Sequence, residues 1–349
     1  MIMTERDTSI LRFLRANQWR DEHRKPLAGD ASFRRYERLL DADRRAVIMD
    51  APPEKEEVRP FWAIAHYLRG AGYSAPEITA VDLDASLLLL EDLGDDLFSR
   101  VVRDDPQCEV SLYEAAVDFL IDLHGEPAPS VVGLPDGSEY PVPAYSEELL
   151  LSEAMLFVDW YLPEIQGTRV TSADRRAFTE IWKSLFGQIP QTPKVLVLRD
   201  YHADNLIWLP QRAGVARVGL LDFQDAVIGS PVYDLVSLLE DARRDVAPSL
   251  AAAMIERYLD KATKRDSSFD AEEFRRAYRI LGAQRNTKII GIFARLWKRD
   301  GKPGYLDLIP RVWGLLEGDL AHPALTEARD WFDGCVPSPA RSAGLEPVQ

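Results

Sequence analysis

The chain has 349 residues, of which 46% are hydrophobic and 28% are charged, a balance typical of a globular protein with two lobes or two small domains. Its formal net charge of −15 argues against a nucleic-acid partner, because binding to phosphate backbones requires clustered Lys and Arg side chains. No apolar run approaches the length of a signal peptide or a membrane span, so we expect a cytoplasmic protein without a membrane partner. Cys108 and Cys335 lack metal-ligand spacing and are expected to be free thiols.

The N-terminal part of the chain is predicted to be rich in strands. Apolar residues at helical spacing predict an amphipathic helix within residues 4–18, and a further helix is predicted over 58–69. Between them, the stretch GDASFRRYERLL (29–40) reads as a glycine-containing turn followed by strand-like residues. Ala46–Asp50 and the apolar run Leu87–Leu90 are predicted to be strands.

The remainder is predicted to be mostly helical. Helices are expected at 110–123, 146–160, 173–188, 232–242, 250–260, 271–295 and 309–316. Short apolar runs at 195–198, 206–209 and 218–221 predict strands, the last two joined as a β-hairpin around PQRAG.

This change of character along the chain predicts a division into parts. We expect a small lobe over residues 1–90, a hinge at 91–95 and a helical lobe over 96–335. The last residues, 336–349, are rich in Pro, Ser and Gly and are predicted to form a flexible tail.

One pair of segments carries the residues for a chemical reaction. Asp200 is followed five residues later by Asn205, and Asp222 comes at the end of the second hairpin strand. Phosphoryl transfer requires a carboxylate to orient the attacking hydroxyl and oxygen ligands to hold Mg²⁺ on the nucleotide phosphates. A carboxylate and an amide across a tight loop, with a second carboxylate on the neighbouring strand, provide hard oxygen ligands that suit magnesium. The sequence contains none of the motifs GxxxxGK[ST], GxGxxG after a strand, GxSxG or HExxH.

The segment LRDYHADN (198–205) resembles the HxDxxxxN catalytic loop of aminoglycoside phosphotransferases and protein kinases. Asp222-Phe223-Gln224 resembles their DFG segment, and Asp234 matches the helix aspartate that braces the catalytic loop. The resemblance implies an α+β, bilobal protein-kinase-like fold, with an antiparallel β small lobe and a mostly α-helical large lobe. It also implies ATP and Mg²⁺ as cofactors, with Asp200 as the catalytic base and Asn205 and Asp222 as metal ligands.

The same resemblance assigns nucleotide-binding residues. The stretch beginning GDASFRRY lies where the family's nucleotide-binding loop covers the phosphates, and the segment around Glu91 lies where its hinge holds adenine through backbone groups. The residues implied are Gly29, Asp30, Ser32, Arg34, Glu91 and Leu93.

More narrowly, the chain resembles the bacterial anomeric kinases of N-acetylmuramate and N-acetylglucosamine. The matching stretches are GDASFRRYERL…VIMDAPP, LLLEDLG, LDFQDAVIGSPVYDLVSLL and QRNTKIIGIFARLWKRDGKPGYLDLIPRVW. This resemblance implies transfer of the ATP γ-phosphate to the C1 hydroxyl of an N-acetylated amino sugar, whose product feeds cell-wall sugar recycling. The two sugars remain equal candidates.

Several residues are candidates for contacts with the acceptor. Arg285 or Lys288 could meet a lactyl carboxylate and Asn286 an N-acetyl group, but a solvated basic helix face is an equal alternative. His202 lies within the catalytic loop and either contacts the substrate or is solvated. Asp225 is either a further contact at the site or a loop-capping carboxylate.

The small lobe departs from the family pattern. The strand AVIMD should carry a lysine that touches the α- and β-phosphates, and it has Met49 or Asp50 instead. Arg34 or Arg35 could supply the missing positive charge. Two further departures, Leu198 for the His of HxDxxxxN and Gln224 for the glycine of DFG, leave the catalytic and metal-binding residues intact.

The alternatives are therefore a kinase of another small alcohol, such as an aminoglycoside or choline, and a nucleotide-binding pseudokinase. The basic QRNTK stretch argues mildly against a cationic acceptor, and the missing lysine motivates the pseudokinase. No obligate protein partner is inferred.

Overall fold

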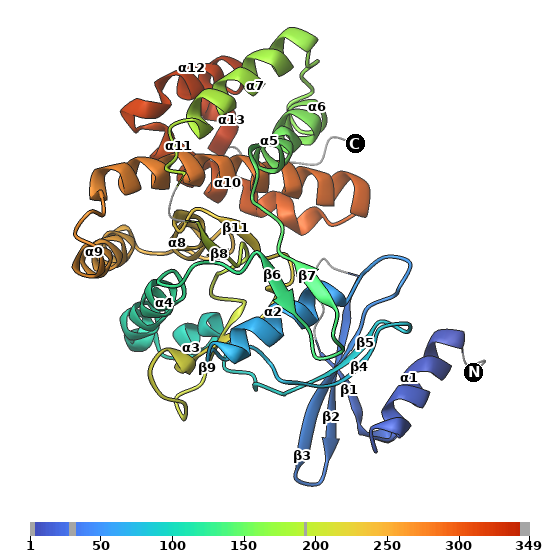
Figure 1. The fold of residues 1–349 in the computed structure, drawn as a ribbon. Helices are drawn as coiled ribbons and strands as arrows, with labels where there is room; N and C mark the ends of the chain where they lie inside the picture. Colours follow the sequence, from blue (N-terminus) through green and yellow to red (C-terminus); the bar gives the residue numbers. More distant parts are fainter. Residues whose placement is uncertain (1–3, 28–32, 192–193, 343–349) are drawn as a thin grey trace. The chain divides into compact units, whose positions relative to one another are not determined.

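The computed structural model describes residues 4–27, 33–191 and 194–342. The chain divides into two compact units, each assembled from segments that are separate in the sequence. The first unit comprises Met1–Phe119, Pro129–Val142 and Ala203–Ala226, and the second comprises Leu120–Ala128, Pro143–His202 and Val227–Gln349. Figure 1 shows the elements of both units in chain order.

The first unit is built on an antiparallel sheet with the strand order β1-β2-β3-β5-β4. Its strands are β1 (Arg24–Pro26), β2 (Arg35–Asp41), β3 (Arg44–Asp50), β4 (Ile78–Asp82) and β5 (Leu87–Leu90). The central strands β3 and β5 are apolar and buried for most of their length, so both faces of the sheet are covered at these strands. The predicted strands at 46–50 and 87–90 are confirmed, whereas β4 has no clear alternation and was not predicted.

Helix α1 (Glu5–Ala16) covers one face of this sheet. Its apolar residues pack on Leu39, Ala46, Ile48, Leu87 and Leu89. Because side chains alternate along a strand, Val47 and Met49 of β3 point to the opposite face. The helix begins with a capping box between Thr4 and Asp7, which satisfies its first backbone N–H groups.

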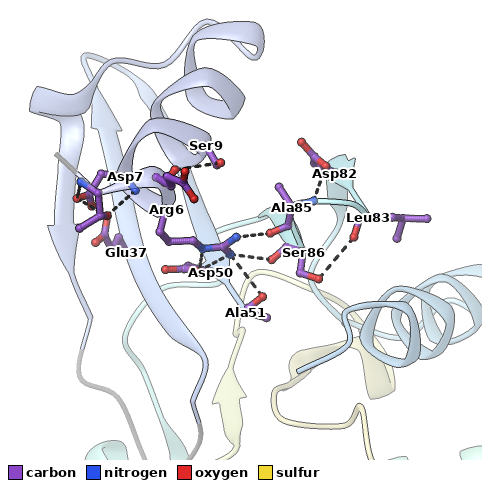
Figure 2. Close-up of polar contacts among 12 residues, drawn as sticks. Arg6, Asp7, Ser9, Glu37, Asp50, Ala51, Asp82, Leu83, Ala85 and Ser86 are labelled. Carbon is purple, nitrogen blue, oxygen red and sulfur yellow. Dashed lines mark hydrogen bonds and ion pairs between the residues drawn. The ribbon is translucent and has the colours of Figure 1, made fainter. Parts of the chain in front are cut away.

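Arg6 of α1 forms hydrogen bonds with residues of the sheet (Figure 2). The Nε–H of Arg6 donates to Asp50 Oδ1 at 2.8 Å, and the same guanidinium donates to the carbonyl oxygens of Ala85 and Ser86. Arg6 therefore links the end of β3 to the turn between β4 and β5. The carboxylate of Asp50 therefore points to the face of the sheet that α1 covers.

The rest of the first unit consists of short elements. These are α2 (Arg59–Gly70), α3 (Phe98–Asp104), the start of α4 (Glu109–Leu123), and the hairpins β6 (Val131–Gly133)–β7 (Glu139–Pro141) and β9 (Leu206–Trp208)–β10 (Val218–Leu220). The β9–β10 hairpin was predicted as such. It lies in the first compact unit, whereas the predicted helical lobe spans 96–335 without a break. Trp208 N–H donates to Asp96 O at 2.8 Å and Leu220 N–H to Ser74 O at 3.0 Å, so the hairpin belongs to the first unit.

The second unit is mostly helical and is organised around α10 (Ala271–Asp300). The other elements are α5 (Glu147–Leu156), which continues through a π-helical turn at Phe157–Tyr161 into α6 (Leu162–Glu164), then α7 (Ser172–Phe186), α8 (Val232–Leu239), α9 (Pro248–Arg265), α11 (Ile309–Leu320), α12 (Thr326–Cys335) and α13 (Ser338–Ser342). A two-stranded pair, β8 (Val195–Val197) with β11 (Val227–Gly229), lies among them. Gly291 lets α10 pass close to α5, since a Cβ there would lie 2.3 Å from the carbonyl carbon of Leu156.

Residues 336–342, which fall within the predicted flexible tail, are packed against the rest of the second unit. Val336 is fully buried, and Arg341 is 5% exposed with ion pairs to Glu317 at 3.1 Å and Asp333 at 2.7 Å. The Pro and Ser residues that suggested disorder instead begin a short helix at Ser338. Within the described residues, no helix combines the length and apolar character needed to cross a membrane.

Candidate active site

The second unit carries the loop that contains Asp200, the candidate catalytic base. Strand β8 leads into Leu198 and Arg199, whose backbone N–H groups donate to the carboxylate of Asp234 on α8 at 2.7 and 2.9 Å. Arg199 has a φ of 68°, a left-handed conformation that is costly for a residue with a Cβ. The buried Asp234 carboxylate holds this strained turn in place and so fixes the backbone that presents Asp200.

The surroundings of Asp200 favour its ionised form. Burial raises the pKa of the Asp200 carboxyl, but the positive charges of Lys288 and Arg199, together with His202, more than offset this, so its pKa lies below the usual value. A carboxylate that remains ionised at neutral pH accepts a proton and cannot donate one. This is the protonation state that a general base needs.

A buried carboxylate, Glu153, organises the cations around Asp200. Lys288 Nζ lies 2.9 Å from Glu153 Oε1, Arg199 pairs with the same carboxylate, and the hydroxyl of Tyr145 donates to Glu153 Oε2 at 2.6 Å. One carboxylate therefore serves two cations, and their remaining positive charge balances the ionised Asp200. The sequence reading missed Glu153; its only trace was a carboxylate within the apolar run LLLSEAMLF.

Two predicted acceptor residues on α10 have partners inside the second unit. Arg285 donates to the carbonyl of Glu240 and to the hydroxyl of Ser237, each at 3.0 Å. Asn286 is fully buried, and its amide donates to the carboxylates of Glu240 at 2.7 Å and Asp319 at 3.1 Å. The alternative of a solvated basic face is therefore wrong for these two residues.

His202 is also buried, with 4% of its surface exposed, so the alternative of a solvated loop histidine is wrong. Its Nε2 lies 3.4 Å from a guanidinium nitrogen of Arg243. Burial lowers the pKa of His202, against the raising effect of Asp241.

The first unit carries the two candidate metal ligands on one hairpin. Leu221 N–H donates to the carbonyl of Asn205 at 2.9 Å, which continues the β9–β10 register, and Asp222 is the next residue. Asn205 and Asp222 therefore lie at the open end of the same hairpin. Asp222 has a φ of 55° and a side chain that is 41% exposed, so its carboxylate is accessible.

These two residues fit a magnesium ion. An amide oxygen and a carboxylate are hard ligands, and Mg²⁺ in kinases completes its shell with waters and phosphate oxygens. Among the described residues there is no cluster of three or more His, Cys, Asp or Glu that could hold a metal without such help. Gln224 Nε2 donates to Asp222 Oδ1 at 3.0 Å and lies 3.4 Å from Asp225 Oδ2, so it orients the first carboxylate and links it to the second.

Arg34 brings a positive charge to the same carboxylate. Its Nη1 lies 3.6 Å from Asp222 Oδ1, and its Nε lies 3.5 Å from Glu56 Oε2. Burial raises the pKa of the neighbouring Tyr36 to about 12, so its hydroxyl stays neutral beside Arg34. Three other predicted residues of the nucleotide loop, Gly29, Asp30 and Ser32, lie outside the described residues.

The predicted hinge is stabilised by ion pairs that were not predicted from the sequence. Arg38 of β2 lies 2.9 Å from Asp92 and 2.7 Å from Asp95. The backbone N–H of Glu91 donates to the carbonyl oxygen of Glu77 at 2.7 Å, so this N–H already has a partner. The carboxylate of Glu91 forms ion pairs with Arg69 and Arg212. Leu93 is partly buried.

Comparison with known proteins shows the family to which the chain belongs. Residues 23–278 match the phosphotransferase enzyme family. The N-acetylmuramate/N-acetylglucosamine kinase of Caulobacter vibrioides is 40% identical, over 97% of this chain and 99% of that protein. The kinase of the same name from Pseudomonas aeruginosa is 39% identical, over 86% of this chain and 85% of that protein.

Solved structures agree on the fold. An aminoglycoside phosphotransferase in a ternary complex with streptomycin and ATP superposes with a TM-score of 0.55, at 13% identity, over 93% of this chain and 98% of that one. The chain belongs to the phosphotransferase enzyme family, and its protein-kinase-like α+β fold was predicted correctly.

Proposed function

We propose that this kinase transfers the γ-phosphate of ATP to the anomeric C1 hydroxyl of N-acetylmuramate, N-acetylglucosamine or both, in the recycling of cell-wall sugars. The observation that carries the chemistry is Asp200, kept ionised among cations on a braced loop. The acceptor is supported by the kinases of Caulobacter vibrioides and Pseudomonas aeruginosa, which carry those two sugars in their name.

In the proposed reaction, the Asp200 carboxylate accepts the proton of the attacking hydroxyl. The C1 oxygen forms a bond to the γ-phosphorus, the bond between that phosphorus and the β–γ bridging oxygen breaks, and ADP leaves. An anomeric hydroxyl is more acidic than other sugar hydroxyls, so a single carboxylate suffices as the base. Asn205 and Asp222 would hold magnesium, which neutralises charge on the phosphates when it is bound.

On the nucleotide side, the proposed contacts are the glycine-containing loop with Gly29, Asp30 and Ser32, the side chain of Arg34, and backbone groups of the segment that contains Glu91 and Leu93. Because the N–H of Glu91 donates to Glu77, its carbonyl is the group left for the base. These assignments rest on the family resemblance together with the accessible metal carboxylate Asp222.

On the acceptor side, Lys288 is the strongest candidate. Its ammonium group forms an ion pair with the carboxylate of Glu153, and its positive charge lowers the pKa of Asp200. The ammonium group of Lys288 suits an acceptor with a carboxylate, such as N-acetylmuramate, and disfavours a cationic aminoglycoside or choline. His202 and Asp225 stay candidate contacts, and the internal contacts of Arg285 and Asn286 suit residues that shape the wall of the acceptor site.

A pseudokinase remains the second candidate, because fully buried Met49 stands where the small-lobe lysine is expected. The proposal is tested by incubating the purified protein with ATP, Mg²⁺ and, separately, N-acetylmuramate, N-acetylglucosamine, kanamycin and choline. We expect ADP release with one or both sugars, and its loss in Asp200→Ala. Phosphorylated kanamycin or choline with unreacted sugars would refute the sugar kinase. ATP binding without turnover on any acceptor would identify a pseudokinase.

A further inference from the structure

The last two residues of β3, where the lysine is expected, offer no cation to a nucleotide. Met49 is fully buried, and Asp50, the next residue, is paired with Arg6 on the face covered by α1 (Figure 2). Both positions where a lysine could lie are therefore occupied by side chains that cannot bind phosphate. If the nucleotide is held by a side-chain cation here, another element must supply it.

The strand register identifies that element. Tyr36 of β2 pairs with Met49 of β3, and Arg35 pairs with Asp50. Arg34 therefore lies one residue beyond the last pair, at the same end of the sheet as Met49 but on the neighbouring strand. Arg35 is exposed, whereas the side chain of Arg34 is 10% exposed and lies 3.6 Å from the metal-binding carboxylate Asp222.

Glu56 fixes the other side of the guanidinium. It lies in the segment before α2, and its carboxylate lies 3.5 Å from Arg34 Nε. Glu56 and Asp222 thus contact different nitrogens of one arginine, which sets the orientation of its planar group. Arginine presents several donors in a rigid fork, and such a fork binds phosphate oxygens bidentately.

We propose that Arg34, oriented by Glu56, is the phosphate-binding cation of the small lobe and takes the place of the lysine that β3 lacks. The inference rests on the proposed use of ATP and names the residue that contacts its phosphates. Arg34 binds the α- and β-phosphates beside the magnesium held at Asp222. Glu56 is a positioning residue, which acts through Arg34 and does not touch the nucleotide.

The test measures nucleotide affinity by calorimetry, without any acceptor, for ATP and for adenosine. Adenosine lacks phosphates, so its affinity reports an intact base pocket and a folded small lobe. The variants are Arg34→Ala, Arg34→Lys and Glu56→Gln. Their matched controls are Arg35→Ala, an adjacent exposed arginine, and Glu57→Gln, an exposed carboxylate beside Glu56.

We expect Arg34→Ala to weaken ATP binding about ten-fold or more, because charge-assisted hydrogen bonds to phosphate are lost, with adenosine affinity unchanged. Arg34→Lys should restore part of the ATP affinity. Glu56→Gln should weaken ATP binding less than Arg34→Ala does. When Glu56→Gln is combined with Arg34→Ala, ATP binding should be no weaker than in Arg34→Ala alone. The controls should stay within about two-fold of wild type, well below the effect of losing a charged hydrogen bond.

Three results would overturn the inference: wild-type ATP affinity in Arg34→Ala, an equal loss of ATP and adenosine affinity, or a loss in Arg35→Ala instead. Each of these leaves the proposed kinase standing, since the wild-type protein still binds ATP. Wild-type protein that binds adenosine no worse than ATP would contradict the proposed function itself.

Discussion

The two units surround their key carboxylates in different ways. Asp222 of the first unit is 41% exposed and is contacted by Arg34 and Gln224. In the second unit, the loop that carries Asp200 is tied to buried groups, with Glu153 at 8% and Lys288 at 12% side-chain exposure. A metal ligand must remain accessible to an incoming ion, whereas a general base must be ionised before it accepts a proton. The two surroundings therefore suit the roles proposed for Asp222 and Asp200.

The largest expected effect comes from Asp200. Asp200→Asn removes the proton acceptor while keeping the shape of the side chain, so we expect kcat to fall by about 10² to 10⁴, the usual contribution of a general base. ATP affinity should be unchanged, because the nucleotide contacts lie elsewhere. The control is Asp204→Asn, a loop carboxylate with no proposed role. A loss of ATP affinity in Asp200→Asn as large as the loss of kcat would contradict the separate roles that we propose for the two units.

The opposite pattern is expected for Asp222. Asp222→Asn should raise the Mg²⁺ concentration needed for half-maximal activity at least about ten-fold, because a neutral amide replaces an anionic ligand. It should also weaken the Mg²⁺-dependent part of ATP binding, measured by titration with and without the metal. An unchanged Mg²⁺ requirement would show that Asp222 does not hold the metal.

A smaller effect is expected from the brace of the catalytic loop. Asp234→Asn leaves one of the two N–H groups, of Leu198 or Arg199, without its acceptor, and a buried unsatisfied donor costs about 1–3 kcal/mol. Urea unfolding of the variant should show this loss of stability, together with a lower kcat. Asp260→Asn, at an exposed position of α9, is the control. Full stability and activity in Asp234→Asn would contradict the bracing role.

The effect of Lys288 on the pKa of Asp200 is tested by measuring activity as a function of pH. Lys288→Met removes a positive charge that lowers the pKa of Asp200, so that pKa should rise. Asp200 would then be protonated at higher pH, and the acid limb of the kcat/KM profile should move to higher pH. Lys298→Met, on the same helix but paired with Glu164 at 2.8 Å, should leave the limb in place. A shift towards lower pH would contradict the assignment of charges.

The smallest effect on activity is expected in the first unit, away from the nucleotide. Arg6→Ala breaks the link between α1 and Asp50 and leaves a largely buried carboxylate without its cation, so stability should fall by about 1–3 kcal/mol. Activity per folded molecule should stay close to wild type, since Asp50 faces α1. Arg12→Ala, exposed on the same helix, is the stability control. A large loss of ATP affinity in folded Arg6→Ala would show that the α1 face is not independent of the site.

Local sequence was enough to propose the parts of the candidate site that lie on one loop or one hairpin. Asp200, Asn205 and Asp222 were proposed because a short apolar strand and a hairpin with a turn surround them. Glu153 was not found, because its partner Arg199 is 46 residues away and no periodicity records such a pair. The same holds for Arg38, whose contact with Asp95 spans 57 residues.

The attachment of the β9–β10 hairpin could not be predicted from the sequence for a related reason. Backbone hydrogen bonds to Ser74 and Asp96 attach the β9–β10 hairpin to the first unit, and composition carries no trace of them. At the C-terminus, composition suggested a flexible tail, but burial of Arg341 between two carboxylates stabilises a helix there.

The most direct test of the central claim is the position of the phosphate on the product. The protein would be incubated with ATP, Mg²⁺ and N-acetylglucosamine, and in parallel with its methyl glycoside, in which the C1 oxygen is blocked. The products would be examined by phosphorus and proton NMR. We predict a phosphorus signal coupled to the anomeric proton for the free sugar and no reaction of the glycoside; phosphorylation of the glycoside, or coupling to a different sugar proton, would contradict it.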